Sequence, residues 1–297
     1  MPLTNELTAG IAHSLVQDPT PSRHRLVDYL KRVHHVTQAE LQKASEYWQA
    51  RYIEEQKEVA SDLIESLPSI IYVLSLLDVF IADQSVIYDR KITSHRSKQV
   101  DRHELERVRE RTVQCLALAF EEFETTLPQV PDWLGDFVES LSVSDDFLVT
   151  TNWDILLDRA IVDSGSQPKS ASRQPDPINY GTDALIVDLA GETSANPIGR
   201  EDRRALYKLH GSFGWLYCQR CSNLYSNPRW PIASLGFGSS RPTSDLADKC
   251  DCGTKLFSVL VTPTFTKSFG NRHLGNVWAA ALRSLRDSEE WHFVGYS

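Results

Sequence analysis

Four cysteines lie in two close pairs, and this spacing is the strongest chemical signal in the sequence. Cys218 and Cys221 form a CxxC pair, and Cys250 and Cys252 follow as a CxC pair. Four thiolates arranged in this way are typical of a tetrahedral structural zinc site. Because four thiolates leave no coordination position open, we predict a structural rather than a catalytic Zn²⁺. The fifth cysteine, Cys115, lies in a helical pattern and is predicted to be a small buried hydrophobe.

Polar or glycine-bearing turns follow four predicted strands. They are TTNWD at residues 150–154, HGS at 210–212, TPT at 262–264 and GYS at 295–297. Because the carboxyl ends of parallel strands form one ligand crevice, we expect these turns to converge. Taken singly, Asn152 and Asp154 are typical of a helix cap and His210 of a packed histidine, and both of these interpretations stay open.

Hydrophobic periodicity predicts a helical segment followed by an α/β segment. Apolar side chains recur at helical spacing between about residues 20 and 140, and short apolar runs ending in polar turns begin at residue 146. We therefore expect a Rossmann-like parallel sheet with a large helical insertion. The predicted helices span residues 25–35, 38–67, 69–82, 101–126, 133–141, 155–162 and 274–285, and the predicted strands span residues 147–149, 184–187, 206–209, 256–261 and 291–294.

Composition places the chain among ordinary globular proteins. Its 297 residues are 41% hydrophobic and 24% charged, with a formal net charge of -9. The acidic balance argues against a surface that holds phosphate backbones, so we expect no nucleic-acid partner. No apolar run reaches membrane-spanning length, and clustered cysteines without a distributed disulfide framework fit a reducing compartment. We expect a cytoplasmic protein without a membrane partner.

The chemical motifs occur in an order that resembles the sirtuin-like family, in particular its prokaryotic branch of NAD-consuming antiphage defence proteins. The matching stretches are FLVTTNWDILLDRA, LYKLHGSFGWLYCQRC, CDCG, VTPTFTK, WAAALRSL and FVGYS, with a weaker likeness in PLTNEL. The resemblance implies a single sirtuin-like domain over residues 1–297. Within it, residues 20–140 would be a helical layer, residues 146–297 the nucleotide-binding part and residues 218–252 a small zinc-ribbon-like insertion. The family also has a strand with a glycine-rich turn before PLTNEL and a segment after GYS, so we expect a chain truncated at both ends.

The resemblance also implies roles for individual residues. Asn152 would hold the nicotinamide ribose or the attacking water, Asp154 would orient the ribose and that asparagine, and His210 would be the general base. Cleavage of the bond between nicotinamide and ribose develops an oxocarbenium-like charge, so a water must be held and deprotonated at one face. The nucleotide-binding residues implied by the resemblance are Thr150, Thr151, Asn152, Gly211, Thr262, Gly295 and Ser297.

The expected activity is hydrolysis of NAD to ADP-ribose and nicotinamide in a prokaryotic defence setting. An NAD-dependent protein deacylase is one alternative, and a catalytically impaired nucleotide-sensing or assembly module is another. NAD serves as substrate in the first two and Zn²⁺ is structural in all three. The expected partners are NAD or ADP-ribose, together with a second copy of the chain or a protein of the same defence system.

Overall fold

The computed structural model divides the chain into two compact units. The first comprises residues 1–128 and 262–267, and the second comprises residues 129–261 and 268–297. The expectation of a single sirtuin-like domain over residues 1–297 stays a prediction. The structure describes residues 6–17, 22–54, 64, 67–82, 102–126, 129–164, 178–187, 193–194, 203–237, 249–262 and 271–294.

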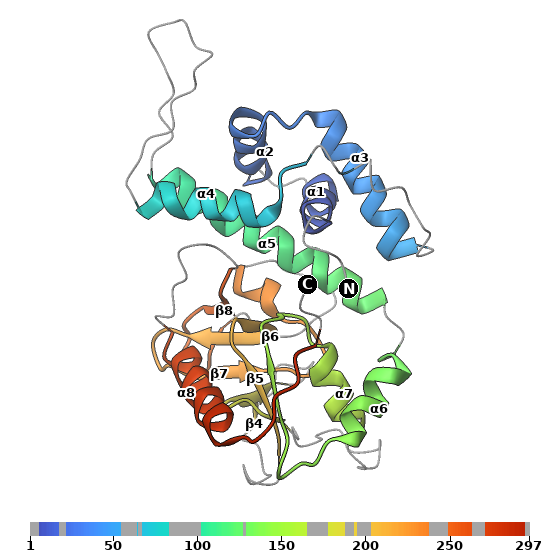
Figure 1. The fold of residues 1–297 in the computed structure, drawn as a ribbon. Coiled ribbons are helices and arrows are strands. Elements are labelled where there is room, and N and C mark those ends of the chain that lie inside the picture. The colour runs from blue at the N-terminus through green and yellow to red at the C-terminus, as the bar shows by residue number, and fades with distance from the viewer. Residues whose placement is uncertain are drawn as a thin grey trace, which may run out of the picture. The chain divides into compact units, whose positions relative to one another are not determined.

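Helices make up the described part of the first unit (Figure 1). The short helix α1 is buried along most of its length and packs against α3 and α5. The boundaries of α2, α4 and α5 agree with the predicted helices to within about three residues. The helices are α1 Leu7–Gln17, α2 Ser22–Val33, α3 Gln38–Trp48, α4 Ile70–Ala82 and α5 Arg102–Thr126, with a π-helix, η1, at Gln49–Glu54.

The predicted helix over residues 38–67 differs from the structure, because α3 ends at Trp48 and continues as the π-helix η1. The wider π turn brings residues five apart to the same side. The hydroxyls of Tyr47 and Tyr52 accordingly both donate hydrogen bonds to the carboxylate of Glu6, at 2.6 and 2.5 Å. Residues 55–63 of the predicted helix lie outside the described residues.

The second unit contains a parallel sheet with helices, so the α/β class is confirmed (Figure 1). Strand β5 lies between β1 and β2, and both pairings are parallel. Helix α8 packs against β5 and α7 packs against β2, and their buried side chains share one core with the sheet. The elements are α6 Asp132–Ser140, β1 Phe147–Thr150, α7 Leu156–Ser164, β2 Ile178–Asn179, β5 Arg204–Lys208 and α8 Arg272–Asp287.

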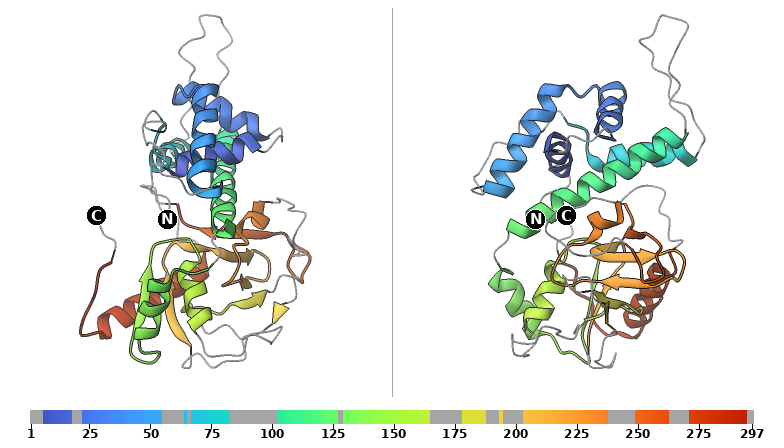
Figure 2. Two further views of the ribbon diagram at one scale, coloured as in Figure 1. Left: turned by 90° about the vertical axis from the view of Figure 1, so that its right-hand side faces the viewer. Right: turned by 180° about the vertical axis from the view of Figure 1, so that it is seen from behind.

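A second, mixed sheet corrects the expectation that all four polar turns end strands of one parallel sheet. Strand β8 pairs antiparallel with β6, and the two run side by side in the views of Figure 2. Only two residues separate β5 from β6. This connection is too short for the crossover between parallel neighbours, so β6 cannot continue the parallel sheet beside β5. The strand order is β4 Thr193–Ser194, β3 Leu185–Val187, β7 Leu224–Ser226, β6 Gly211–Cys218 and β8 Leu256–Leu260, and a 3₁₀-helix, η4 Ala233–Phe237, packs against β6 and β8.

The predicted strand at residues 291–294 is wrong. These residues have no strand structure, and Phe293 and Val294 are 82% and 85% exposed. A short strand is stable only where a neighbouring strand satisfies its backbone groups and a core covers its side chains. Among the described residues no strand pairs with this segment and no core covers its side chains, so local β propensity does not determine its structure.

Candidate functional site

Two of the predicted polar turns lie side by side at one edge of the parallel sheet. The backbone N–H of Leu209 donates a hydrogen bond to the carbonyl oxygen of Thr150 at 2.9 Å, which continues the β1–β5 pairing beyond the strand ends. Four residues later, the N–H of Phe213 donates to the carbonyl of Trp153 at 2.8 Å. Residues 150–154 and 209–213 are therefore joined by main-chain hydrogen bonds at both ends.

The end of strand β8 joins the same two turns. The N–H of Val261 donates to the carbonyl of His210 at 2.8 Å, and the indole N–H of Trp153 donates to the carbonyl of Val261 at 3.1 Å. Three segments that are distant in sequence thus meet, although β8 belongs to the mixed sheet, where it pairs antiparallel with β6. The sequence predicted that these segments converge but did not predict how they are connected.

The threonines and the asparagine of the first turn differ in exposure. Thr150 is half-buried, whereas Thr151 and Asn152 are exposed. The N–H of Asn152 donates to the hydroxyl of Thr150 at 3.1 Å, which fixes the main chain of the turn. The carboxamide of Asn152 is therefore available to a ligand at this edge of the sheet.

Asp154 is buried and has a structural role that can be seen directly. Its Oδ1 accepts a hydrogen bond from the N–H of Leu156 at 3.1 Å, at the start of helix α7, so the helix-cap interpretation is correct for this residue. Burial raises the pKa of Asp154, and the opposing effect of Lys208 does not cancel this. Oδ2 is buried, and none of the described residues forms a hydrogen bond with it.

Sequence reasoning missed a buried ionic network next to this turn. Lys208, at the end of β5, donates to the carboxylate of Asp158 at 2.7 Å and to the carbonyl oxygen of Asp154. The hydroxyl of Tyr180 donates to the other oxygen of Asp158, also at 2.7 Å. The only signal in the sequence was a lysine inside the apolar run ALYKL, where a buried charge requires a partner.

The remaining predicted site residues do not all lie in one unit. His210 is 8% exposed, and the buried Gly211 that follows it has a φ of 82°. This left-handed conformation explains why glycine follows the histidine. Thr262 falls in the first unit, where its hydroxyl accepts a hydrogen bond from Arg109 at 2.9 Å. Gly295 and Ser297 lie outside the described residues.

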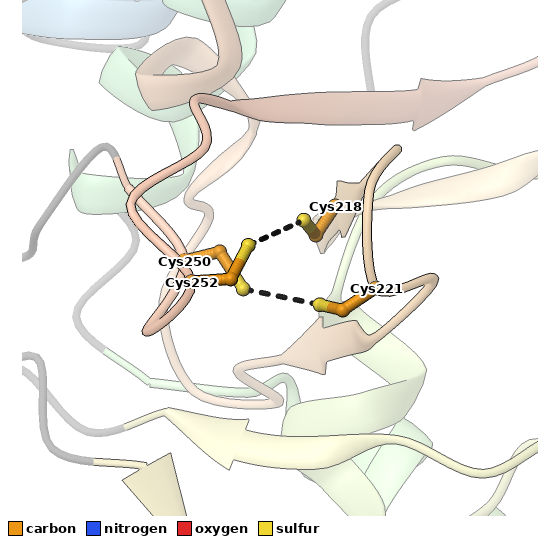
Figure 3. A group of neighbouring side chains, drawn as sticks. All are labelled: Cys218, Cys221, Cys250 and Cys252. Atoms are coloured by element: carbon orange, nitrogen blue, oxygen red, sulfur yellow. Dashed lines mark hydrogen bonds between the residues drawn. The ribbon is translucent and has the colours of Figure 1, made fainter.

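The four clustered cysteines form a compact group in the second unit (Figure 3). Cys218 ends strand β6, Cys221 lies in the following turn, and Cys250 and Cys252 lie in the tight turn before β8. The sulfur atoms of Cys218 and Cys252 are 3.5 Å apart, and those of Cys221 and Cys250 are 3.3 Å apart. All four sulfur atoms lie within 4.8 Å of one another.

This geometry suits a tetrahedral metal ion. In a tetrahedral site with a Zn–S distance of about 2.3 Å, the sulfur atoms would be about 3.8 Å apart. This separation lies between the two short sulfur–sulfur distances, 3.3 and 3.5 Å, and the 4.8 Å within which all four sulfur atoms lie. Hydrogen bonds with Thr254 lower the pKa of Cys252 to about 6, so this ligand is readily available as a thiolate. The cluster can therefore bind a metal ion such as Zn²⁺.

A tyrosine supports the cysteine cluster from the neighbouring strand. Tyr225 on β7 is 2% exposed, and its hydroxyl lies 3.0 Å from the sulfur of Cys250. A phenol hydroxyl can donate to a thiolate, and such donors orient metal ligands. The CxxC and CxC spacing did not reveal this contact, because Tyr225 appears in the sequence as an ordinary strand residue.

Comparisons with known proteins do not assign a family. No family model, curated protein or solved structure matches the chain. The sirtuin-like assignment therefore stays a prediction based on residues. None of the described helices combines the length and the apolar composition needed to cross a bilayer.

Proposed function

We propose that this chain is a sirtuin-like protein that binds NAD and hydrolyses it to ADP-ribose and nicotinamide. The observation that carries the proposal is the adjacency of β1 and β5. These strands deliver Asn152 and His210 to one edge of the parallel sheet, where Leu209 and Thr150 share a main-chain hydrogen bond. Ligands of open α/β sheets bind at this edge.

In the proposed reaction, a water molecule attacks the anomeric carbon of the nicotinamide ribose. The bond between this carbon and nicotinamide breaks, and nicotinamide leaves with the bonding electrons. Asn152 holds the water or the ribose with its exposed carboxamide. His210 accepts the proton of the attacking water, because imidazole is the side chain best suited to proton transfer near neutral pH.

Asp154 is proposed to orient the ribose and Asn152 through the main chain of the turn. The residue is 6% exposed, and its Oδ1 accepts a hydrogen bond from the N–H of Leu156 at the start of α7. This contact fixes the end of the turn that carries Asn152.

The cysteine cluster is proposed to hold a structural Zn²⁺. Cys218 ends β6, Cys221 lies in the β6–β7 connection, and Cys250 and Cys252 precede β8. A bound ion would link these segments and stabilise the sheet that β6 and β8 share. It leaves no open position for substrate, so chemistry at the ribose depends on the residues near β1 and β5.

The test is release of nicotinamide from NAD by the purified chain and by the variants Asn152→Ala and His210→Ala. Loss of a positioned group or a general base is expected to slow turnover by about 100-fold or more. His103→Ala, which changes an exposed histidine, is the matched control and should leave turnover unchanged. Equal turnover by the wild type and both site variants would refute these roles.

Nicotinamide release and calorimetry together separate the alternatives. A deacylase would release nicotinamide only when an acetylated lysine peptide is present. A nucleotide-sensing module would bind ADP-ribose in a calorimeter without consuming NAD. Hydrolysis in the absence of peptide, lost with His210→Ala, is the result expected here.

A further inference from the structure

A fully buried lysine lies next to the turn that carries Asn152 and Asp154. Lys208 is 0% exposed, and it pairs in register with Thr150, where this turn begins. Its ammonium group donates a hydrogen bond to the main-chain carbonyl of Asp154, near the end of the turn. One buried side chain therefore contacts the turn from the neighbouring strand.

The charge of Lys208 is balanced by Asp158 on helix α7. Oδ2 of this carboxylate accepts from the lysine at 2.7 Å, and Oδ1 accepts from the hydroxyl of Tyr180 at 2.7 Å. Lys208 and Asp158 side chains are each 1% exposed. A buried ion pair adds little stability compared with well-packed apolar residues, so stability alone gives little reason for a lysine at this position.

We propose that Lys208 is a positioning residue that fixes the turn of residues 150–154 for nucleotide binding. This inference rests on the proposed function. Because Lys208 is fully buried, it acts through the carbonyl of Asp154 rather than by touching a ligand. Its ion pair with Asp158 on α7 holds the ammonium group in place. The ammonium group in turn holds the carbonyl of Asp154 at the end of the turn.

The test removes the network without leaving a buried charge. The triple variant K208M/D158L/Y180F replaces all three groups with apolar ones and is expected to keep a denaturation midpoint near that of the wild type. K208M/D158N, which leaves an acceptor for Tyr180, is the second variant if the triple variant does not fold. The matched control is R229Q/D163N, which removes an exposed ion pair at 3.0 Å that also involves α7.

Amide hydrogen exchange tests the positioning itself, without any ligand. The N–H groups of Asn152 and Leu156 bond within the turn, to Thr150 and Asp154. In the folded network variant they are expected to exchange about tenfold faster or more, while the amide of Cys250 in the same unit is unchanged. Unchanged exchange at Asn152 and Leu156 would overturn the proposal.

Calorimetry with ADP-ribose tests the functional consequence. The network variant is expected to bind about tenfold more weakly or worse, because a displaced turn misplaces its ligand groups, and the exposed-pair control should bind as the wild type does. Faster exchange with undiminished binding would overturn the link to the nucleotide. If the wild type itself bound no ADP-ribose, the proposed function would fail, while the exchange result would still decide whether Lys208 fixes the turn.

Discussion

Gly211 lies directly against the main chain of Val259, so that a β-carbon at position 211 would be 1.9 Å from the Val259 carbonyl oxygen. Position 211 also has a positive φ of 82°. Gly211→Ala is therefore expected to lower the free energy of unfolding by about 2 kcal/mol or more, through backbone strain and displacement of β8 from β6. Chemical denaturation of the full chain measures this loss.

Gly275→Ala is the matched control for this prediction. Gly275 is exposed within helix α8, and a β-carbon there would meet no atom within 4 Å. Alanine at this position should raise stability by up to about 1 kcal/mol, because it favours the helix. If Gly211→Ala were as stable as the wild type, the close approach of β6 and β8 at this point would be wrong.

The cysteine cluster predicts a single Zn²⁺ per chain. Cys221→Ser removes one of four ligands and is expected to lower bound zinc, measured by mass spectrometry of the purified chain. Cys115→Ala changes a buried cysteine of the first unit and should retain zinc. Zinc content that is equally low in the wild type and Cys221→Ser would contradict the assignment.

Tyr225 is expected to strengthen zinc binding. Tyr225→Phe removes the hydroxyl that lies 3.0 Å from Cys250, and zinc affinity should fall by about tenfold because the ligand loses its supporting donor. Competition with a chromogenic chelator measures this change. The control is Tyr217→Phe on the adjacent strand β6, and equal affinities for the two variants would show that the contact has no effect.

The stability of the first unit should depend on the protonation of His34. Burial, with a smaller contribution from His35, lowers the pKa of His34 from 6.5 to about 4, and its ring lies edge-on to Tyr29 and Tyr72. The folded state therefore binds a proton less readily than the unfolded state. The stabilising effect is complete above pH 6.5 and is lost as the pH falls towards 4.

His34→Phe tests this dependence, because it keeps an aromatic ring and removes the titrating group. The free energy of unfolding of the wild type, relative to this variant, is expected to fall between pH 6.5 and 4. His103→Phe changes an exposed histidine and should show no comparable trend. A constant difference between the wild type and His34→Phe would contradict the lowered pKa of the half-buried His34.

The features that the sequence predicted correctly are those with a local or repeated signal. Helix α5 follows from apolar residues at helical spacing over 25 residues, and the cysteine cluster follows from two close pairs. The parallel sheet that contains β1 and β5 follows from apolar runs that end in polar turns, although their pairing was not predicted. In each case the feature depends on residues that lie close together in the sequence, so a local pattern predicts it.

The features that it missed depend on contacts between distant residues. A π turn after Trp48 leaves no mark in a periodicity of 3.6, and it appears only when Tyr47 and Tyr52 meet Glu6. The antiparallel pairing of β8 depends on the path of β6, and the role of Lys208 depends on a carboxylate 50 residues away. Local propensity also predicted a strand at residues 291–294, which pair with no strand of the described part of the chain.

The most direct test of the central claim is a double-mutant cycle for ADP-ribose binding. Calorimetry on the wild type, Asn152→Ala, His210→Ala and the double variant measures whether both side chains contact one ligand. If they line a shared site, each single variant binds more weakly and the two losses are not additive, with a coupling free energy of about 0.5 kcal/mol or more. Wild-type binding that neither substitution weakens, or no binding at all, would contradict the claim.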